Sequence, residues 1–255
     1  MRMRFWVLIA VWVLVGCALG TSGSAPEIDI DITDNPPAET MTLQERCESK
    51  EGFVWEGSFG ICRYTQEGNP IIDIEYPVTI AHEPMIERTM DSYVTILREQ
   101  FVTDFEINGA QSPGAFQLIL EPIIYLRDDS IISVRWDETR YVGGANISFE
   151  YTTFVFDLNQ ADLLRFSDLF TDDTDVLTTI QPLVRDSLTT QIGDTTTQDA
   201  IIRGTDELVE FDHFVLTDTD LLIFFEPYTV EAGALGAQTI RLSLDSVPNL
   251  REVYR

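Results

Sequence analysis

The segment of residues 141–158, YVGGANISFEYTTFVFDL, constrains the fold more than any other part of the sequence. Its adjacent glycines, Gly143 and Gly144, permit positive φ angles and close approach by another stretch of backbone. Apolar and polar residues then alternate, and the alternation shifts by one residue at Thr152-Thr153. Such a shift moves the apolar side chains to the other face of a sheet unless a β-bulge absorbs it. We therefore predict a central strand that contains a bulge and begins at a glycine corner.

This glycine corner has two interpretations at the level of sequence. It is either the kinked start of a core strand or part of a ligand-binding surface. A second glycine-containing turn, from Tyr228 to Gly236, would lie on the same surface in the second interpretation. The candidate ligand-binding residues are Tyr141, Gly143, Gly144, Asn146, Phe149 and Tyr228.

The rest of the chain predicts a mixture of strands and two long helices. Residues 83–105 carry an apolar stripe at spacings of three and four, which is typical of a helix packed on a core. Residues 175–192 are also helix-like, although Pro182 should kink or restart that helix, and residues 193–204 look like a loop. Strands are predicted at 71–80, 116–126, 131–141, 211–216, 221–228 and 238–244, and residues 163–170 predict a short strand followed by the turn SDLF. The predicted fold class is α+β, with antiparallel sheets and one long helix in each half.

Composition and charge limit the kinds of molecule that this chain is expected to bind. Hydrophobic residues make up 44% of the 255 residues, so the chain can build a core, and its formal net charge is −27. Such a surface repels nucleic acids and anionic lipid headgroups, and it attracts cationic partners and divalent cations. The alternative explanation of the charge is solubility, or life in a salty medium.

The N-terminal segment predicts export and lipidation. Arg2 and Arg4 precede an apolar run that is short for a membrane span but fits the core of a signal peptide. The run ends in LVGC, which resembles the lipobox of bacterial lipoproteins, and this resemblance implies lipidation of Cys17. We expect a signal peptide at 1–16 and a lipidated tether at 17–45. An ordinary cleaved signal and an uncleaved anchor are the alternatives.

Export sets the expected location and charge of the mature chain. Loss of residues 1–16 removes two of the 16 basic residues and none of the 43 acidic ones, which leaves 14 − 43 = −29. The lipid would hold the protein in the cell envelope, on the outer face of the cytoplasmic membrane or on an outer membrane. Only four residues precede the apolar run, so we expect no cytoplasmic signalling segment.

The other two cysteines, Cys47 and Cys62, predict a disulfide. Exported proteins form disulfides, and the residues between these two are rich in glycine. A hairpin at residues 46–68, closed by this bond, is similar to cysteine-closed hairpins of bacterial lipoproteins. The alternative is a zinc-binding or redox pair, but no second cysteine pair or nearby histidine accompanies it.

Four sequence blocks resemble a known bacterial family. In order, they are YVGGA at 141–145, TTFVFDL, LLRFSDLF and HFVLTDTDLLIFFEPYTVEAGALG. Over residues 139–250 they resemble the RsiV-type domain of unknown function. Residues 69–138 resemble the companion N-terminal domain that precedes it in the anti-sigma factor RsiV and in the peptidoglycan deacetylase PdaC. Family members often read Gly-Gly-Ala-His, and here Asn146 stands in place of that histidine.

The resemblance implies an extracytoplasmic recognition module without catalytic activity. In RsiV the extracytoplasmic part binds lysozyme, and in PdaC the domain pair sits beside a separate catalytic domain. The expected ligand is therefore a cell-wall glycan or a protein, including a cationic lysozyme-like protein. Tyr141, Phe149 and Tyr228 would supply aromatic contacts to it.

Enzyme chemistry has little support in the sequence. His82 and His213 are the histidines of the chain, and no metalloprotease, nucleophile-elbow or phosphate-loop motif is present. Asp172, Asp173 and Asp175 lack the spacing of an EF-hand. We expect no catalytic residue, metal or cofactor. The alternatives are a hydrolase that acts on cell-wall glycans through a carboxylate pair and a purely structural envelope protein, and the oligomeric state stays open.

Overall fold

The computed structural model describes residues 41–255, except 58–59, 113, 194–197 and 232–234. Cys17, the expected signal peptide and most of the expected tether lie outside the described residues. The helices are α1 (Leu43–Glu48), α2 (Pro84–Asn108), α3 (Val176–Ile192) and α4 (Gln198–Arg203). The strands are β1 (Phe53–Trp55), β2 (Cys62–Gln66), β3 (Ile71–Tyr76), β4 (Gln117–Arg127), β5 (Ile131–Tyr141), β6 (Ser148–Asp157), β7 (Asp162–Leu164), β8 (Phe214–Leu216), β9 (Asp220–Phe225) and β10 (Gln238–Ser243).

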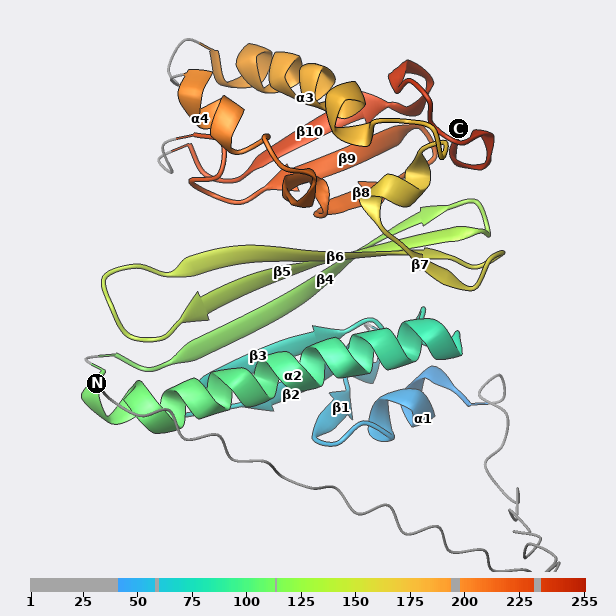
Figure 1. The fold of residues 1–255 in the computed structure, drawn as a ribbon. Helices are drawn as coiled ribbons and strands as arrows, with labels where there is room; N and C mark the ends of the chain where they lie inside the picture. Colours follow the sequence, from blue (N-terminus) through green and yellow to red (C-terminus); the bar gives the residue numbers. More distant parts are fainter. Residues whose placement is uncertain (1–40, 58–59, 113, 194–197, 232–234) are drawn as a thin grey trace, which may run out of the picture. The chain divides into compact units, whose positions relative to one another are not determined.

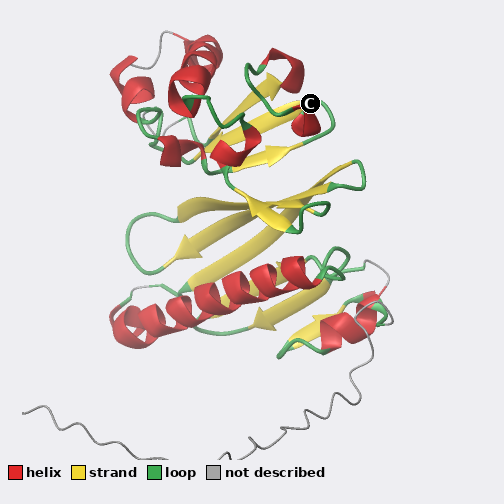
Figure 2. Ribbon diagram, turned by 45° about the vertical axis from the view of Figure 1, so that its right-hand side comes forward, coloured by secondary structure: helices red, strands yellow, loops and turns green. Residues whose placement is uncertain are grey.

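The predicted α+β class is confirmed, with a seven-stranded and a three-stranded sheet. The large sheet has the order β1-β2-β3-β4-β5-β6-β7, and the small sheet has the order β10-β9-β8. Figures 1 and 2 show α2 running along the strands of the large sheet and α3 packed on the small sheet. None of the helices in the described part of the chain has both the length and the hydropathy of a membrane span.

One pair of strands departs from the antiparallel arrangement that we expected. β3 and β4 pair in parallel, with Ile72 opposite Leu118. Parallel neighbours need a crossover, and α2 supplies it between the two strands. Its buried stripe of Ile86, Met90, Val94, Leu97 and Phe101 packs in the same core cluster as the sheet residues Trp136 and Phe156.

The predicted bulge in β6 is wrong. β6 pairs with β5 in one unbroken register, from Ile131 opposite Asp157 to Arg140 opposite Ser148. The apolar alternation shifts because both faces of the strand are covered, the small-sheet face at Tyr151 and Val155 and the α2 face at Phe154 and Phe156. Tyr151 packs against the small sheet with Phe224, whereas Phe156 points to the opposite face and packs in the α2 cluster. A shift in the apolar alternation indicates a bulge only in a strand that has one face exposed to solvent.

Two hydroxyl groups, besides the apolar core that the sheets share, join the edge of the small sheet to the large one. The outer edge of β8 has no further strand in the described structure, but its backbone N–H groups are satisfied. Leu216 N donates to Ser133 Oγ on β5 (3.1 Å), and Phe214 N donates to Thr153 Oγ1 on β6 (3.0 Å). These two side chains take the place of a neighbouring strand, so the edge of β8 is fixed against the large sheet.

The expected domain boundaries differ from the observed ones. The boundary between residues 138 and 139 falls inside β5, and the described residues, from 41 to 255, belong to one compact unit. Residues 43–45, which we assigned to the tether, belong to α1. Residues 193–204, which we expected to be a loop, contain α4, and Pro182 lies within the continuous α3 helix.

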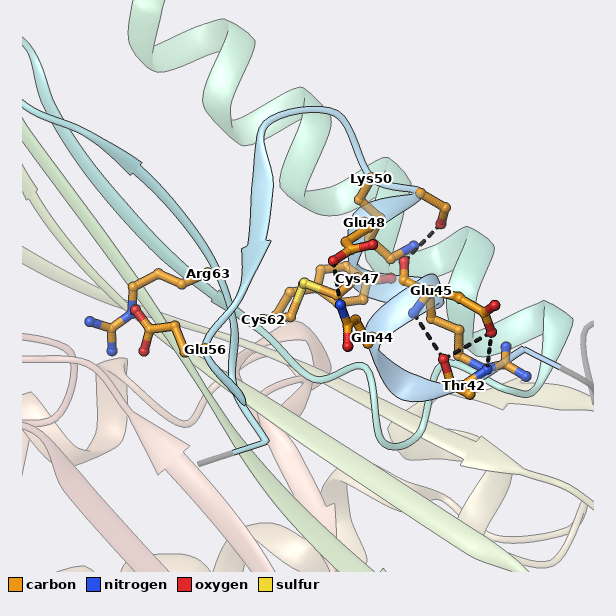
Figure 3. Close-up of a disulfide and its surroundings, with 12 residues drawn as sticks. Thr42, Gln44, Glu45, Cys47, Glu48, Lys50, Glu56, Cys62 and Arg63 are labelled. Carbon is orange, nitrogen blue, oxygen red and sulfur yellow. Dashed lines mark hydrogen bonds and ion pairs between the residues drawn. A yellow bond between two sulfur atoms is a disulfide. The ribbon is translucent and has the colours of Figure 1, made fainter. Parts of the chain in front are cut away.

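A disulfide joins Cys47, near the end of α1, to Cys62 at the start of β2 (Figure 3). A capping box between Thr42 and Glu45 begins α1. The chain's single lysine, Lys50, then fastens this segment to α2. Its Nζ atom lies 3.0 Å from Glu87 and 2.8 Å from Asp91, and the side chain is only 8% exposed.

Candidate functional site

The glycine corner connects β5 to β6, and its residues are needed for local packing. Gly143 has φ of +80°, and a Cβ atom there would lie 2.6 Å from Ser112 Oγ. The Tyr141 hydroxyl donates to the Gly144 carbonyl oxygen over 3.2 Å, which closes the corner. Tyr141, Gly143 and Gly144 therefore shape the loop, as the first interpretation of the sequence expected.

A groove of about 730 Å³ lies directly beside this corner. One wall is formed by the end of the loop and the start of β6, and includes Asn146, Phe149 and Glu150. The other wall comes from the chain between β9 and β10, and includes Glu226, Tyr228 and Gly236. We call this cavity the β6 groove. The structure thus brings Asn146, Phe149 and Tyr228 together, while Tyr141, Gly143 and Gly144 do not line it.

Two aromatic side chains of the β6 groove are open to solvent. Phe149 is 52% exposed and Tyr228 is 76% exposed. Tyr228 also has φ of +74°, a conformation that is uncommon for a residue with a bulky side chain and that costs on the order of 1–3 kcal/mol. Exposed aromatic groups and local strain are both more frequent at binding sites than elsewhere.

The two walls are tied together by Glu226. Its Oε1 atom accepts a hydrogen bond from the Tyr151 backbone N–H over 3.1 Å. The Thr229 N–H donates to the Glu226 carbonyl oxygen (3.2 Å), which forms the turn that carries Tyr228. The position of the Tyr228 wall is therefore coupled to the edge of β6.

Negative charge is concentrated around this end of the large sheet. Burial raises the pKa of Glu138, the Arg140 guanidinium opposes this shift, and the nearby charges of Glu150 and Glu226 add to it. Arg140 Nε lies 2.6 Å from Glu138 Oε1, so one guanidinium stands near three carboxylates and forms its ion pair with Glu138. The arrangement favours a ligand with positive charge or with hydrogen-bond donors.

The β4–β5 turn, at the other end of these strands, borders a second cavity of about 590 Å³. It is lined by His82 and Glu83 and by the apolar side chains of Leu126 and Ile132. None of the residues predicted for ligand binding lies there. His213 lines a smaller cavity of about 200 Å³ with Glu210 and Glu226.

The acidic turn that was weighed as a calcium site has structural contacts instead. Asp172 pairs with Arg251, and Asp175 caps α3 by accepting from the Thr178 N–H. Within the described part of the chain, no group of three acidic, histidine or cysteine side chains could hold a metal ion.

Glu150 and Glu226 are the charged groove residues that the sequence did not point to. With 43 acidic residues in the chain, neither stands out. The available signal was position, since Glu150 follows Phe149 and Glu226 precedes Tyr228 by two residues.

Residues 167–245 match the model of the family described as "Protein of unknown function (DUF3298)". The peptidoglycan-N-acetylmuramic acid deacetylase PdaC of Bacillus subtilis (strain 168) is 28% identical over 126 residues. That match covers 48% of this chain and 27% of PdaC, so the chain spans about a quarter of the length of that relative.

Two crystal structures share the fold. A DUF3298 family member from Bacteroides fragilis matches with a TM-score of 0.51 and 15% identity, over 74% of this chain and 91% of that one. A DUF3298 family protein from Pseudomonas aeruginosa also gives a TM-score of 0.51, with 12% identity over 74% and 92% of the two chains.

Proposed function

We propose that this chain, whose residues 167–245 match the DUF3298 model, is a recognition module of the bacterial cell envelope that binds its ligand in the β6 groove. The ligand is a cationic protein or a cell-wall glycan. The chain acts by binding and has no catalytic activity of its own. This proposal rests on one observation above all, the pair of exposed aromatic side chains that face the groove from two distant parts of the sequence.

Phe149 and Tyr228 suit both kinds of ligand. Aromatic side chains give large contact areas at low entropic cost, and they dominate the energetics of many interfaces. Glu150 and Glu226 add charge and hydrogen-bond acceptors beside the rings. With a net charge of −27, the chain also gains long-range attraction to a basic partner.

The similarity to PdaC supports a cell-wall setting, because the name of that relative describes an enzyme acting on peptidoglycan. The proposal includes anchoring through lipid at Cys17, so that the groove is displayed outside the cytoplasm. Metabolic labelling with palmitate should tag the wild-type protein and not the Cys17→Ser variant. Equal labelling of both proteins would contradict this anchoring.

A binding experiment tests the proposed function. We expect egg-white lysozyme or a soluble muropeptide to bind the full chain in titration calorimetry at physiological salt. Tyr228→Ala and Phe149→Ala should each weaken binding by about 10-fold or more, since an aromatic anchor contributes about 2 kcal/mol or more. Ile96→Ala, at an exposed position on α2, is the matched control and should have no effect. Binding that disappears at physiological salt, or that ignores both groove variants, would contradict the proposal.

One observation favours a second function, a hydrolase that acts on cell-wall glycans. Glu150 and Glu226 line the same groove, and glycan hydrolysis uses two carboxyl groups. The same protein preparation should then release reducing ends from purified peptidoglycan, and Glu150→Gln or Glu226→Gln should abolish the release. No release by the wild type would rule out this second function.

A further inference from the structure

β6 is paired unequally on its two sides. On one side β5 pairs with the strand from Ser148 to Asp157. On the other side β7 pairs only with residues 155–157. Within the described structure, residues 148–154 therefore form a sheet edge without a neighbouring strand, and the first part of that edge lies in the β6 groove.

The backbone groups of the odd-numbered residues point toward this open side. Leu158 N–H, just beyond the strand, donates to Ser130 on the β5 side, and the directions alternate along a strand. Tyr151 N–H points the other way and donates to the Glu226 carboxylate, which occupies the place of a neighbouring strand's carbonyl. Thr153 is covered by the start of β8, since its hydroxyl donates to the Asp212 carbonyl oxygen and accepts from the Phe214 N–H. The open position is therefore Phe149.

We propose that the β6 groove takes an extended polypeptide segment, which adds to the large sheet as a strand beside Phe149 and carries basic residues alternating with apolar ones. This inference rests on the proposed function, because it names the class of ligand for the same groove. Main-chain hydrogen bonds would give affinity, and side chains on alternate faces would give specificity.

Side-chain alternation defines the sequence of such a segment. Phe149 and Tyr151 point to the face of the small sheet, so residues opposite them are apolar. Glu150 points to the other face, where Glu138 lies directly opposite it on β5. Like charges in that position destabilise a sheet, and the ion pair that Arg140 forms among the described residues is with Glu138. A basic residue of the incoming strand beside Glu150 would relieve this repulsion.

Tyr228 and Glu226 would close over the added segment from the other wall. Tyr228 is the most exposed of the large hydrophobic side chains in the described residues, so it is available to cover an incoming apolar residue. A glycan could stack on the same ring, but it could not supply the alternating N–H and C=O groups that an edge strand lacks. The polypeptide is therefore the ligand that the edge favours.

Backbone methylation of the ligand tests this inference on the wild-type protein. The probe is a nine-residue peptide of alternating valine and arginine, with blocked termini, in three forms: unmodified, N-methylated at the valines, and N-methylated at the arginines. In an added strand only one of these sets of N–H groups faces β6. We expect methylation of the valines to weaken binding by about 10-fold or more, because a residue opposite Phe149 in an antiparallel pair bonds to it through N–H and C=O. Methylation of the arginines should leave the affinity within about 2-fold.

Protein variants provide a second readout. Phe149→Pro and Phe149→Ala both lack the ring, but only the proline lacks the outward N–H, so proline should weaken binding further. Glu150→Gln should weaken binding of the unmodified peptide by about 5-fold. Glu121→Gln, which makes the same charge change at an exposed position on β4, should not.

The outcomes separate this inference from the proposed function. Loss of affinity with only one of the two methylated peptides supports strand addition. Whether that peptide is methylated at its valines or at its arginines reports the direction of the added strand. Equal affinity for all three peptides would overturn strand addition and would mean that binding comes from attraction between charges. A muropeptide that binds in a Tyr228-dependent manner, without peptide binding, would overturn strand addition and keep the proposed function. No binding of lysozyme, muropeptide or peptide would overturn both.

Discussion

The two halves of β6 belong to one strand but have opposite environments. Residues 148–150 are exposed and pair on one side only, whereas residues 155–157 are buried and pair on both sides. Phe156 packs within the α2 cluster and Phe149 faces the β6 groove. The same kind of side chain therefore stabilises the fold in one half and is available to a ligand in the other. Stability and binding should be separable by substitutions a few residues apart.

Phe156→Ala and Phe149→Ala are the strongest test of this comparison. Phe156 is fully buried, so its truncation should lower the free energy of unfolding by about 3–5 kcal/mol. Phe149→Ala should change it by no more than about 0.5 kcal/mol, as expected for a surface position. Urea unfolding followed by circular dichroism measures both values, and similar losses for the two variants would contradict the division of the strand.

Removing the disulfide should destabilise the protein without affecting the groove. A cross-link between residues separated by 15 positions stabilises by about 3 kcal/mol in the chain-entropy account. The Cys47→Ala/Cys62→Ala double variant should lose about that amount in urea unfolding and keep its affinity for the ligand. Peptide mapping without reduction gives the matched control, since it should find the two cysteines joined in exported wild-type protein. Free thiols at both positions would refute the bond.

Ser133→Ala tests the attachment of the small sheet to β5, beside the buried half of β6. Ser133 lies opposite Val155 and is fully buried, and its hydroxyl is the partner of the Leu216 N–H. Its loss leaves a buried N–H unsatisfied and should cost about 1–3 kcal/mol. Ser148→Ala removes a hydroxyl from the open half, where water can replace it, and should cost no more than about 0.5 kcal/mol. Equal effects would show that the two halves do not differ as we describe.

The smallest expected effect concerns pH and Glu138. Because the folded state raises the pKa of this carboxyl, folding favours its protonated form, and the associated stability is lost as pH rises. Glu138→Gln keeps the neutral form, so its stability relative to wild type should increase between about pH 4 and neutral pH. Thermal unfolding across this range measures the difference, with Glu121→Gln as control. A difference that is constant with pH would contradict the assignment.

The sequence was sufficient to predict those helices and strands that bury only one face, because their apolar residues recur at a regular spacing. The stripe from Ile86 to Phe101 predicted α2, and the strands expected at 116–126 and 131–141 correspond to β4 and β5, which pair antiparallel. The sequence could not reveal that β6 is covered on both faces, because Tyr151 and Phe156 are buried by elements far apart in the chain. The parallel pairing of β3 with β4 depends likewise on tertiary contacts.

The candidate site was only partly predictable, because it also depends on tertiary contacts. Phe149 and Tyr228 attract notice as aromatic residues near glycines, but their common groove forms only when the chain after β9 folds back to β6. Gly143 was recognised as special, and its role is packing against Ser112. Glu226 acquires meaning only through its hydrogen bond to Tyr151.

The most direct test of the central claim is an NMR titration of the full chain, labelled with ¹⁵N, with the unmodified valine–arginine peptide. We predict that the amide signals of Phe149, Tyr151 and Tyr228 shift on binding and that the Phe149 amide becomes protected from hydrogen exchange. The amide of Phe156 and those around the cavity at His82 should stay unchanged. Shifts spread over the acidic surface, or confined to the His82 cavity, would contradict the account of β6 as a strand with one structural half and one binding half.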